Sequence, residues 1–418
     1  MSSFTQNISE PTNKHVSVGL DGKVSVDLTF VEEPLGLPAQ EGYGWPQLEF
    51  NQTIGPGSRY VIVRKLGWGM SSSTWLARDL QENSHVAIKI LNGYNTDLAQ
   101  RGRVWELEAL KRLSSPTSSA HCLRLISNFT IPGKGSAGKH LCLVTQLLGG
   151  DVKSLHERHR TVFPFLLAKR ILLHVLRGIV HAHSRGVVHT DLKHDNVFFD
   201  ACTSAEVLDK FLASDPPRRH PPESSYDGTV SAAVSQPLPA PTMEEAMQRN
   251  YVVADFGSAQ SITNHTTDEI TPLPLRPPEI IIGGPWNEKV DIWTFGCLIF
   301  ELVTGRGLFK YEPYEKYNLD EKNYILYQII CYTGEDFSAE QLTVSSLAGN
   351  FFDSTCNLRA RPPLFNYPFE LSIRSYKVIQ EADVLSTAAL MRRCLRLDPA
   401  QRASAADLLS DPWFAGVD

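Results

Sequence analysis

Several features that would place this chain in other protein classes are absent from its sequence. Its seven cysteines are scattered and form no Cys-x-x-Cys pair, so the sequence predicts neither a disulfide framework nor a zinc site. It has no run of about eighteen apolar residues, the length that a membrane span requires. The start, MSSFTQNISEPTNKHVSVG, lacks the charged segment and apolar core of a signal peptide. We therefore expect an intracellular protein, in the cytoplasm, the nucleus or both, with no membrane partner.

A basic surplus and internal repeats are also missing. The 40 basic and 46 acidic side chains give a formal net charge of -6, without the basic footprint of a nucleic-acid-binding protein. We expect no direct contact with nucleic acid. Apolar residues make up 42% of the 418 positions, which is enough for a large core and for two or three structural units without disulfides. The sequence does not indicate an oligomeric state.

Composition divides the chain into three parts. Residues 1–57 are rich in proline, glycine and serine and predict an irregular extension with one short strand over 23–30. Residues 58–148 contain strand-like runs such as YVIVRKL and HVAIKIL, followed by the periodic segment RGRVWELEALKRL, and predict a small β-rich unit with one amphipathic helix over 101–113. Residues 149–418 are mainly helical in pattern.

Two long apolar segments and a proline-rich insert stand out in the third part. The segments at 166–184 and 290–304 are interrupted by charged residues and predict buried core helices. The insert, at about 201–250, offers one short helix in SAEVLDKFLAS. Its remainder, from DPPRRHPPESS to SQPLPAPTM, predicts neither helix nor strand because proline interrupts both.

The stretch LGWGMSSSTWLARD is the first with chemical meaning. Gly67 and Gly69 allow backbone amides to approach an anion closely, and Ser72 takes the third position of a Gly-x-Gly-x-x-Gly pattern. Taken alone, the stretch favours a hairpin turn without a ligand. The next predicted strand carries Lys89 in VAIK, and a lysine within an apolar strand requires a carboxylate or phosphate partner.

Two glutamates on the following helix compete as the partner of Lys89. Glu106 has Leu110 four residues later on the same helix face, which directs it toward the core. We therefore prefer Glu106 to Glu108.

The stretch VVHTDLKHDN holds the strongest candidates for catalysis. Asp191 is suited to accept a hydroxyl proton, Lys193 to neutralise a transferring phosphoryl group, and Asn196 to bind magnesium through its oxygen. The alternative is a polar loop capped by its own side chains. Further along, VVADFGSAQ predicts a strand that ends at Asp255, a second metal ligand, with Phe256 packing to orient it.

Two further carboxylates are predicted to serve the structure. Glu279, in LRPPEIIIGG, has a distant candidate ion partner in Arg402. Asp291, in the first turn of the segment at 290–304, is expected to accept backbone amides of the loop that carries Asp191.

Together and in this order, these motifs resemble the eukaryotic protein-kinase signature over roughly residues 59–416. The resemblance implies an α+β, two-lobed protein-kinase fold: a small β-rich N-lobe with one helix, a larger mainly helical C-lobe, and ATP with Mg²⁺ in the cleft between them. It also implies transfer of the ATP γ-phosphate to protein substrates. Lys193, in DLK, is similar to serine/threonine kinases rather than tyrosine kinases.

Finer features resemble the serine/arginine-rich protein kinases and their fungal relatives. These are LGWG with Ser72, VVHTDLK, an insert before Asp255, and Arg276 three residues before Glu279. The implied substrates are arginine/serine-rich. Phe256 departs from that group, where leucine is common at this position.

The resemblance also implies an adenine pocket. Thr145 would be the gatekeeper and Gln146 to Leu148 the hinge, while three side chains would enclose the purine: Leu66, Ala87 and Phe198. Thr74, in place of the usual valine, is compatible with ATP binding. Ordinary core packing is the alternative for each of these residues.

Two other features bear on substrate and regulation. An acidic group after the second long helix could attract an arginine-rich substrate or form a solvated face: Glu312, Glu315, Asp320, Glu321, Glu335 and Asp336. Thr190 stands where regulated kinases carry an arginine, and a threonine cannot pair with a phosphate as a guanidinium does. We therefore expect activity without phosphorylation of the segment after Asp255.

Two rival functions share part of the pattern. A pseudokinase scaffold would have the same fold, but such proteins usually lack the lysine, the base or a metal ligand, and all are present here. A small-molecule kinase of the aminoglycoside or choline type could use an aspartate base, but it would not be expected to carry the PPE and VDIWTFG segments.

Overall fold

The structure is a computed structural model that describes residues 13–18, 24–201 and 204–418. The described chain forms two compact units. Unit 1 is built from the described residues of Met1–Val104, Leu125–Leu147 and Ala201–Leu238, and unit 2 from Trp105–Arg124, Leu148–Asp200 and Pro239–Asp418. The units cross the predicted boundary at 148/149, because residues 105–124 pack within unit 2 and residues 201–238 pack within unit 1.

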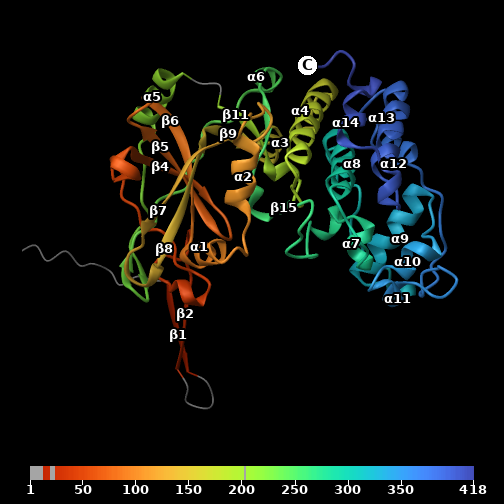
Figure 1. Cartoon of the computed structure of the whole chain (residues 1–418), viewed down its shortest axis with the longest axis horizontal. Coiled ribbons are helices and arrows are strands. Elements are labelled where there is room, and N and C mark those ends of the chain that lie inside the picture. Colours follow the sequence, from red (N-terminus) through yellow and green to blue (C-terminus); the bar gives the residue numbers. More distant parts are fainter. Residues whose placement is uncertain (1–12, 19–23, 202–203) are drawn as a thin grey trace, which may run out of the picture. The chain divides into compact units, whose positions relative to one another are not determined.

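Unit 1 is organised around an antiparallel six-stranded sheet in the order β3-β4-β5-β6-β8-β7 (Figure 1). Its strands are β3 (Thr53–Ile54), β4 (Tyr60–Trp68), β5 (Ser72–Asp79), β6 (Ser84–Leu91), β7 (Leu125–Pro132) and β8 (Lys139–Gln146). Branched and aromatic side chains, which favour strands, fill one face with a core that includes Ile62, Trp75, Ile88 and Val144. The predicted β-rich unit is confirmed.

The helix predicted over 101–113 begins later in the structure. It is α2 (Glu106–Ser114), and it is preceded by α1 (Gly93–Gln100), which the sequence analysis did not predict. Asn92 caps α1 by accepting a hydrogen bond from the Asn95 amide at 2.8 Å. Gly102 then adopts a φ of 72°, a left-handed conformation that separates the two helices.

The insert is more ordered than predicted. Its expected helix is α5 (Ala205–Ser214), capped by Ser204. The remainder contains the hairpin β12 (Glu223–Ser225) and β13 (Gly228–Val230) and the short helix α6 (Met243–Ala246). The prediction of no strand was wrong because the hairpin uses a proline-free stretch that turns at Tyr226 and Asp227, and Gly228 follows the turn with a φ of 102°. Near the N-terminus, β1 (Lys14–Val18) pairs with β2 (Val24–Leu28), which is the strand predicted over 23–30.

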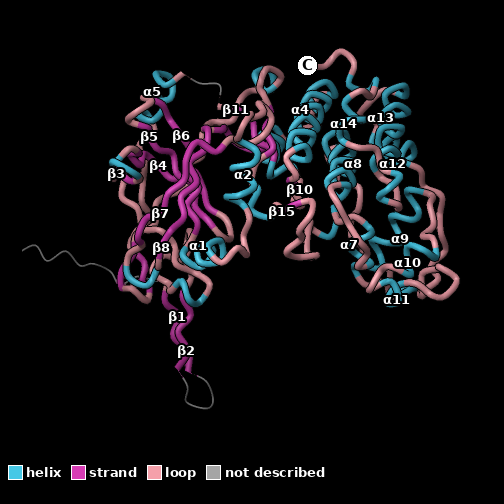
Figure 2. Tube along the Cα trace, in the orientation of Figure 1, coloured by secondary structure: helices cyan, strands magenta, loops and turns pink. Residues whose placement is uncertain are grey.

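Unit 2 is rich in helices, in contrast to the strands of unit 1 (Figure 2). Both predicted core helices are present, as α4 (Phe165–Ser184) and α8 (Lys289–Thr304). Unit 2 also contains α2 and α6, given above, and these helices: α3 (Val152–His159), α7 (Pro278–Ile282), α9 (Glu321–Thr333), α10 (Ala339–Thr343), α11 (Ala348–Phe351), α12 (Phe369–Tyr376), α13 (Glu381–Cys394) and α14 (Ala405–Leu409).

Helix α8 is apolar because it is enclosed by other helices. It packs against α4, α12 and α13, and nearly all of its side chains are buried. Burial on all sides explains why the sequence of α8 is an almost continuous apolar run. Within the described ranges, no helix combines the length and the hydropathy that crossing a bilayer requires.

Candidate active site

Two neighbouring strands of unit 2 bring the predicted metal ligands to one end of a small sheet. Strand β11 (Val197–Asp200) pairs antiparallel with β14 (Tyr251–Val253) and with β9 (Leu148–Asp151). Asn196 directly precedes β11, and Asp255 lies two residues beyond β14. The Ala254 amide donates to the Asn196 carbonyl at 2.9 Å, which continues the ladder. Asn196 and Asp255 therefore lie at the same end of this sheet.

Asp191 is held by the two other polar side chains of its motif. The Lys193 ammonium donates to Asp191 Oδ2 at 2.8 Å. The Asn196 amide group donates to the Asp191 carbonyl oxygen at 2.7 Å and to Oδ2 at 3.1 Å. The Asp191 side chain is 20% exposed, so its carboxylate is fixed in direction and still reached by solvent. This geometry suits a base that receives a proton from a bound hydroxyl.

The same contacts determine what Asn196 can offer a metal. Because its nitrogen donates to Asp191, its Oδ1 is the atom with which it could bind a cation. Asp255 is exposed and adopts a φ of 55°, and the Gly257 amide donates to its Oδ1 at 3.4 Å. Oxygen donors of this kind suit Mg²⁺, which proteins commonly bind through one or two carboxylates together with substrate phosphates. The donor set therefore fits the predicted ion.

His189 connects the loop of Asp191 to the segment of Asp255. Its Nε2 lies 2.9 Å from the Ala254 carbonyl and can only donate there, so Nδ1 accepts from the Asp191 amide at 3.3 Å. The imidazole also lies 4.8 Å, centroid to centroid, from the ring of Phe256, which is fully buried. Phe256 packs as predicted, and His189 holds both functional segments.

Asp291 fixes the backbone of the same loop, as predicted. Its carboxylate accepts the amides of His189 at 2.8 Å and Thr190 at 2.9 Å, and the His183 imidazole lies 2.9 Å from Oδ2. Burial alone would raise the pKa of Asp291, but the hydrogen bonds from His183 and the backbone hold this pKa below its ordinary value. Sequence reasoning missed His183, which lies at the end of α4 in an ordinary helical pattern.

The predicted pair of Glu279 and Arg402 is also present. Arg402 donates from both terminal nitrogens to the two carboxylate oxygens of Glu279, each at 2.6 Å. The two side chains are 0% and 6% exposed. The guanidinium also lies 5.0 Å from the ring centroid of Trp293, so its charge is compensated on more than one side.

Thr190 joins the catalytic loop to the segment that follows Asp255. Its hydroxyl donates to the Ser258 carbonyl at 2.7 Å, and its own carbonyl accepts from the Thr271 hydroxyl at 2.8 Å. Thr190 adopts a φ of 64°, a rare conformation for a β-branched residue. Two neutral hydrogen bonds thus order this segment without a phosphate.

We predict that a protein in which five of the six serine and threonine side chains of this segment are replaced stays active. The variant replaces five residues by alanine and keeps Thr271, whose hydroxyl is a structural donor: Ser258, Ser261, Thr263, Thr266 and Thr267. Peptide phosphorylation should remain within about threefold of the wild-type rate, because the Thr190 hydrogen bonds are intact. A loss greater than tenfold in a folded variant would show that loop phosphorylation is needed.

The glycine turn and the predicted phosphate-binding lysine belong to unit 1. The turn joins β4 to β5, and the Gly69 amide closes it by donating to the Ser72 carbonyl at 3.0 Å. A Cβ built on Gly67 or Gly69 would meet no described atom within 4 Å, so the turn has open space beside it. Lys89, on β6, is half-buried and lies opposite Thr74 on β5.

The predicted adenine-pocket residues fall in both units. In unit 1, Ala87 lies opposite Thr145 in the β6–β8 ladder, both are buried, and Thr145 donates to the Gln146 carbonyl at 3.2 Å. In unit 2, Leu148 and Phe198 pack in one cluster with Val252 and Ala254. The half-buried Leu66 ends the apolar part of β4. Adenine recognition by these residues stays a prediction.

The two candidate glutamates of helix α2 differ in burial. Glu106 is 3% exposed in the first turn of the helix, whereas Glu108 is exposed and pairs with Lys111 at 3.4 Å. The helix packs against the turn Phe256–Ser258 within unit 2. Glu106 is thus the inward-facing glutamate, as predicted, and its pairing with Lys89 stays a prediction.

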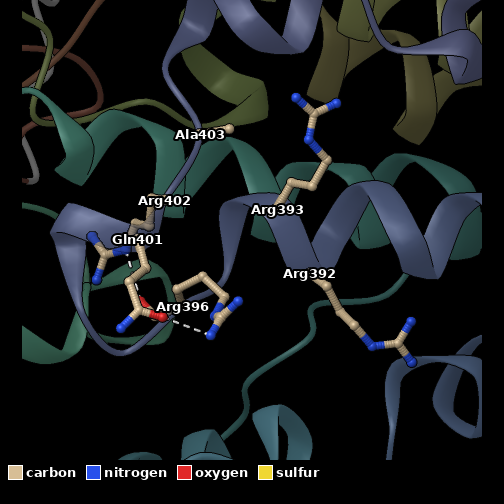
Figure 3. A pocket seen from close by; sticks show the side chains of 6 residues that line it. All are labelled: Arg392, Arg393, Arg396, Gln401, Arg402 and Ala403. Atoms are coloured by element: carbon tan, nitrogen blue, oxygen red, sulfur yellow. Dashed lines mark hydrogen bonds between the residues drawn. The ribbon is translucent and has the colours of Figure 1, made fainter.

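A separate shallow cavity of about 270 Å³ lies among arginines of unit 2 (Figure 3). It is lined by Arg392, Arg393, Arg396, Gln401, Arg402 and Ala403. Each of the four arginines pairs with a carboxylate outside this set: Glu370, Asp411, Glu335 and Glu279. The cavity contains none of the predicted site residues, and its charges are already balanced.

Comparison with known proteins establishes the class of this molecule. The protein kinase domain family matches residues 60–231 and 243–414, so the chain belongs to the protein kinase family. The chain is 29% identical to the serine/threonine-protein kinase SRPK of Physarum polycephalum, over 86% of this chain and 87% of that protein. It is 24% identical to protein kinase dsk1 of Schizosaccharomyces pombe (97% and 89%) and to SRSF protein kinase 3 of Mus musculus (85% and 86%).

These matches confirm several predictions. The chain is an ATP-dependent serine/threonine protein kinase with the predicted two-lobed α+β fold, and it resembles SR-type kinases and their fungal relatives. ATP and Mg²⁺ are the cofactors of this family, and its substrates are proteins. Nothing in the comparisons favours a pseudokinase, and the roles predicted for Lys89, Asp191, Asn196 and Asp255 stay predictions.

Proposed function

We propose that this kinase phosphorylates serine and threonine hydroxyls in arginine/serine-rich protein segments, with Asp191 as the catalytic base. The observation that carries the proposal is the hydrogen-bonded set formed by Asp191, Lys193 and Asn196. Asp291 holds the backbone of the same loop by accepting the Thr190 amide. Asp191 would orient the substrate hydroxyl and take its proton. Lys193 would offset charge that develops on the transferring phosphoryl group.

The remaining residues have roles in binding the nucleotide. Asn196 and Asp255 would hold Mg²⁺, which supplies charge neutralisation at the phosphates when it is bound. The amides of the glycine turn and the Lys89 ammonium would bind the phosphates, with Glu106 orienting Lys89. Catalysis then depends on positioning and electrostatics, without a covalent enzyme intermediate.

Exposed acidic residues support the proposed preference for arginine-rich substrates. Five acidic residues in and beside α9 along the chain are exposed, and one of them, Glu312, also pairs with the exposed Lys310 at 3.3 Å: Glu312, Glu315, Asp320, Glu321 and Asp336. Such a group would attract a cationic peptide. The sixth predicted member does not belong to this surface, because Glu335 is half-buried, pairs with Arg396 and accepts the Leu397 amide at 2.8 Å.

The test neutralises part of this surface. In the triple variant Glu312→Gln, Glu315→Gln, Glu321→Gln, the KM for an arginine/serine repeat peptide should rise about tenfold, because exposed charge pairs contribute up to about 1 kcal/mol each. The kcat should not change. The matched control replaces three exposed glutamates elsewhere: Glu82, Glu157 and Glu206.

Salt and peptide charge sharpen the test. Raising the salt concentration should remove most of the difference between wild type and the triple variant, since salt screens exposed charges. A glutamate/serine repeat peptide should be a poor substrate for all three proteins. Equal KM values for wild type, triple variant and control would refute the role of this surface.

An intracellular site of action, in the cytoplasm, the nucleus or both, is part of the proposal. The six described cysteines are all free thiols, as expected in a reducing compartment: Cys122, Cys142, Cys297, Cys331, Cys356 and Cys394.

A further inference from the structure

Strand β4 buries two consecutive cations immediately before the glycine turn. Arg64 and Lys65 are both 0% exposed, and they point to opposite faces because side chains alternate along a strand. Arg64 pairs with Asp215 of the insert at 3.2 Å. Burying a charge is costly unless it is paired, so each cation requires a fixed partner.

The partners of Lys65 come from the N-terminal segment. Its ammonium donates to Glu32 at 2.9 Å and contacts Glu33, and these carboxylate side chains are 8% and 1% exposed. The insert completes the site, because Ser235 donates to Glu32 from its amide at 2.8 Å and from its hydroxyl at 2.7 Å. The Gln236 amide donates to the Lys65 carbonyl at 3.0 Å. Lys65 is therefore held through both its side chain and its backbone.

A second contact reaches the glycine turn itself. Trp68, between Gly67 and Gly69, meets Trp45 edge to face, with ring centroids 5.7 Å apart and an angle of 87°. The Lys65 ammonium lies 5.8 Å from the Trp68 ring centroid. Trp45 is 2% exposed whereas Trp68 is 45% exposed. The buried ring of Trp45 therefore supports the partly solvent-exposed ring of Trp68.

Trp45 is itself rigidly placed. It packs in a buried cluster with Leu35 of the same segment and with Val230 and Ala232 of the insert. The Gly44 carbonyl accepts the amide of Gly93, the first residue of α1, at 2.7 Å. We call residues 32–48 the N-terminal brace.

We propose that the N-terminal brace, supported by the insert, positions the glycine-rich turn for nucleotide, with Trp45, Trp68 and Lys65 as positioning residues. The inference rests on the proposed role of Gly67 and Gly69 in phosphate binding. A turn with two glycines and open space beside it loses conformational entropy when it closes on a ligand. Holding the turn from β4 and from Trp68 reduces that loss before the nucleotide binds, which strengthens binding.

The test compares two variants of one cluster. Trp45→Ala removes the ring beside Trp68, and Leu35→Ala removes another buried side chain of the same cluster. Both should lower the melting temperature, since both leave a cavity. Only Trp45→Ala should raise the KM for ATP and the Kd for Mg·ADP, by about tenfold, and Trp45→Phe should restore most of the affinity. The kcat should change little.

A charge-neutral double variant tests the charge contact. Lys65→Met combined with Glu33→Met removes one charge of each sign, so it leaves no new net charge in the cluster. It should raise the Kd for Mg·ADP while the protein stays folded by circular dichroism. Binding of Mg·ADP should change the tryptophan fluorescence of the wild-type protein, and this change should be absent in Trp68→Phe.

The outcomes separate this inference from the proposed function. Equal Kd values for Mg·ADP in wild type, Trp45→Ala and Leu35→Ala would overturn the brace, whatever the phosphotransfer rate. Wild-type protein that binds Mg·ADP and transfers no phosphate would instead overturn the proposed role of Asp191, while the Kd comparison would still decide the role of the brace.

Discussion

Replacing Asp191 with asparagine should lower the kcat for peptide phosphorylation by about a thousandfold, within the range of 10² to 10⁴ for a positioned general base. Asparagine keeps the size and can still orient a hydroxyl, but it cannot accept the proton. The contacts with Lys193 and Asn196 place the Asp191 carboxylate for this role. The KM for ATP should change little, because Asp191 is not expected to contact the nucleotide.

Asp195→Asn is the matched control. It changes another aspartate to asparagine in the same loop, where Asp195 pairs with Lys153 at 3.0 Å and is 35% exposed. Its kcat should remain within about threefold of wild type. Steady-state kinetics with purified proteins, together with circular dichroism, provide the measurement. Similar losses in both variants would mean that the loop was disturbed generally and that Asp191 has no special part.

Replacing Arg402 with methionine should lower the free energy of unfolding by about 3 to 5 kcal/mol. The cause is Glu279, which would remain buried with its charge uncompensated. The double variant Arg402→Met, Glu279→Leu should recover most of the loss, because apolar residues of similar size can replace a buried ion pair at little cost. Urea unfolding monitored by fluorescence gives both values.

An exposed ion pair serves as the control for this series. Arg374 and Glu381 are 46% and 58% exposed and contribute little because water solvates both groups. Arg374→Met should leave the unfolding midpoint unchanged. A double variant of Arg402 and Glu279 as unstable as the single variant would show that the guanidinium acts through its other contacts, such as the donation to the Arg396 carbonyl at 2.8 Å.

The part of the candidate site around Asp191 was readable from the sequence because its residues are close along the chain. Asp191, Lys193 and Asn196 lie within six positions, and the contacts among them follow from the loop itself. Glu279 and Arg402 lie far apart along the chain, and the sequence offered Arg402 only as a candidate partner, which the structure confirms. His183 gave no signal, since nothing in a helical HAHS pattern shows which carboxylate it will meet.

The parts that could not be predicted depend on contacts between distant segments. YVIVRKL reads as an ordinary strand, but its two cations are buried because carboxylates from the N-terminal segment and the insert reach them. The same contacts order segments whose proline and glycine content predicts irregular chain. Sequence periodicity reports which face of an element is apolar, and it carries no information about such partners.

The most direct test of the central claim follows the terminal phosphate of ATP. In a single-turnover experiment with γ-labelled ATP, Mg²⁺ and an arginine/serine repeat peptide, the label should appear on peptide serine, with none on the enzyme at any time, and Asp191→Asn should transfer almost none. Equal labelling by wild type and Asp191→Asn, or passage of the label through an enzyme-bound intermediate, would contradict direct transfer to a hydroxyl beside Asp191.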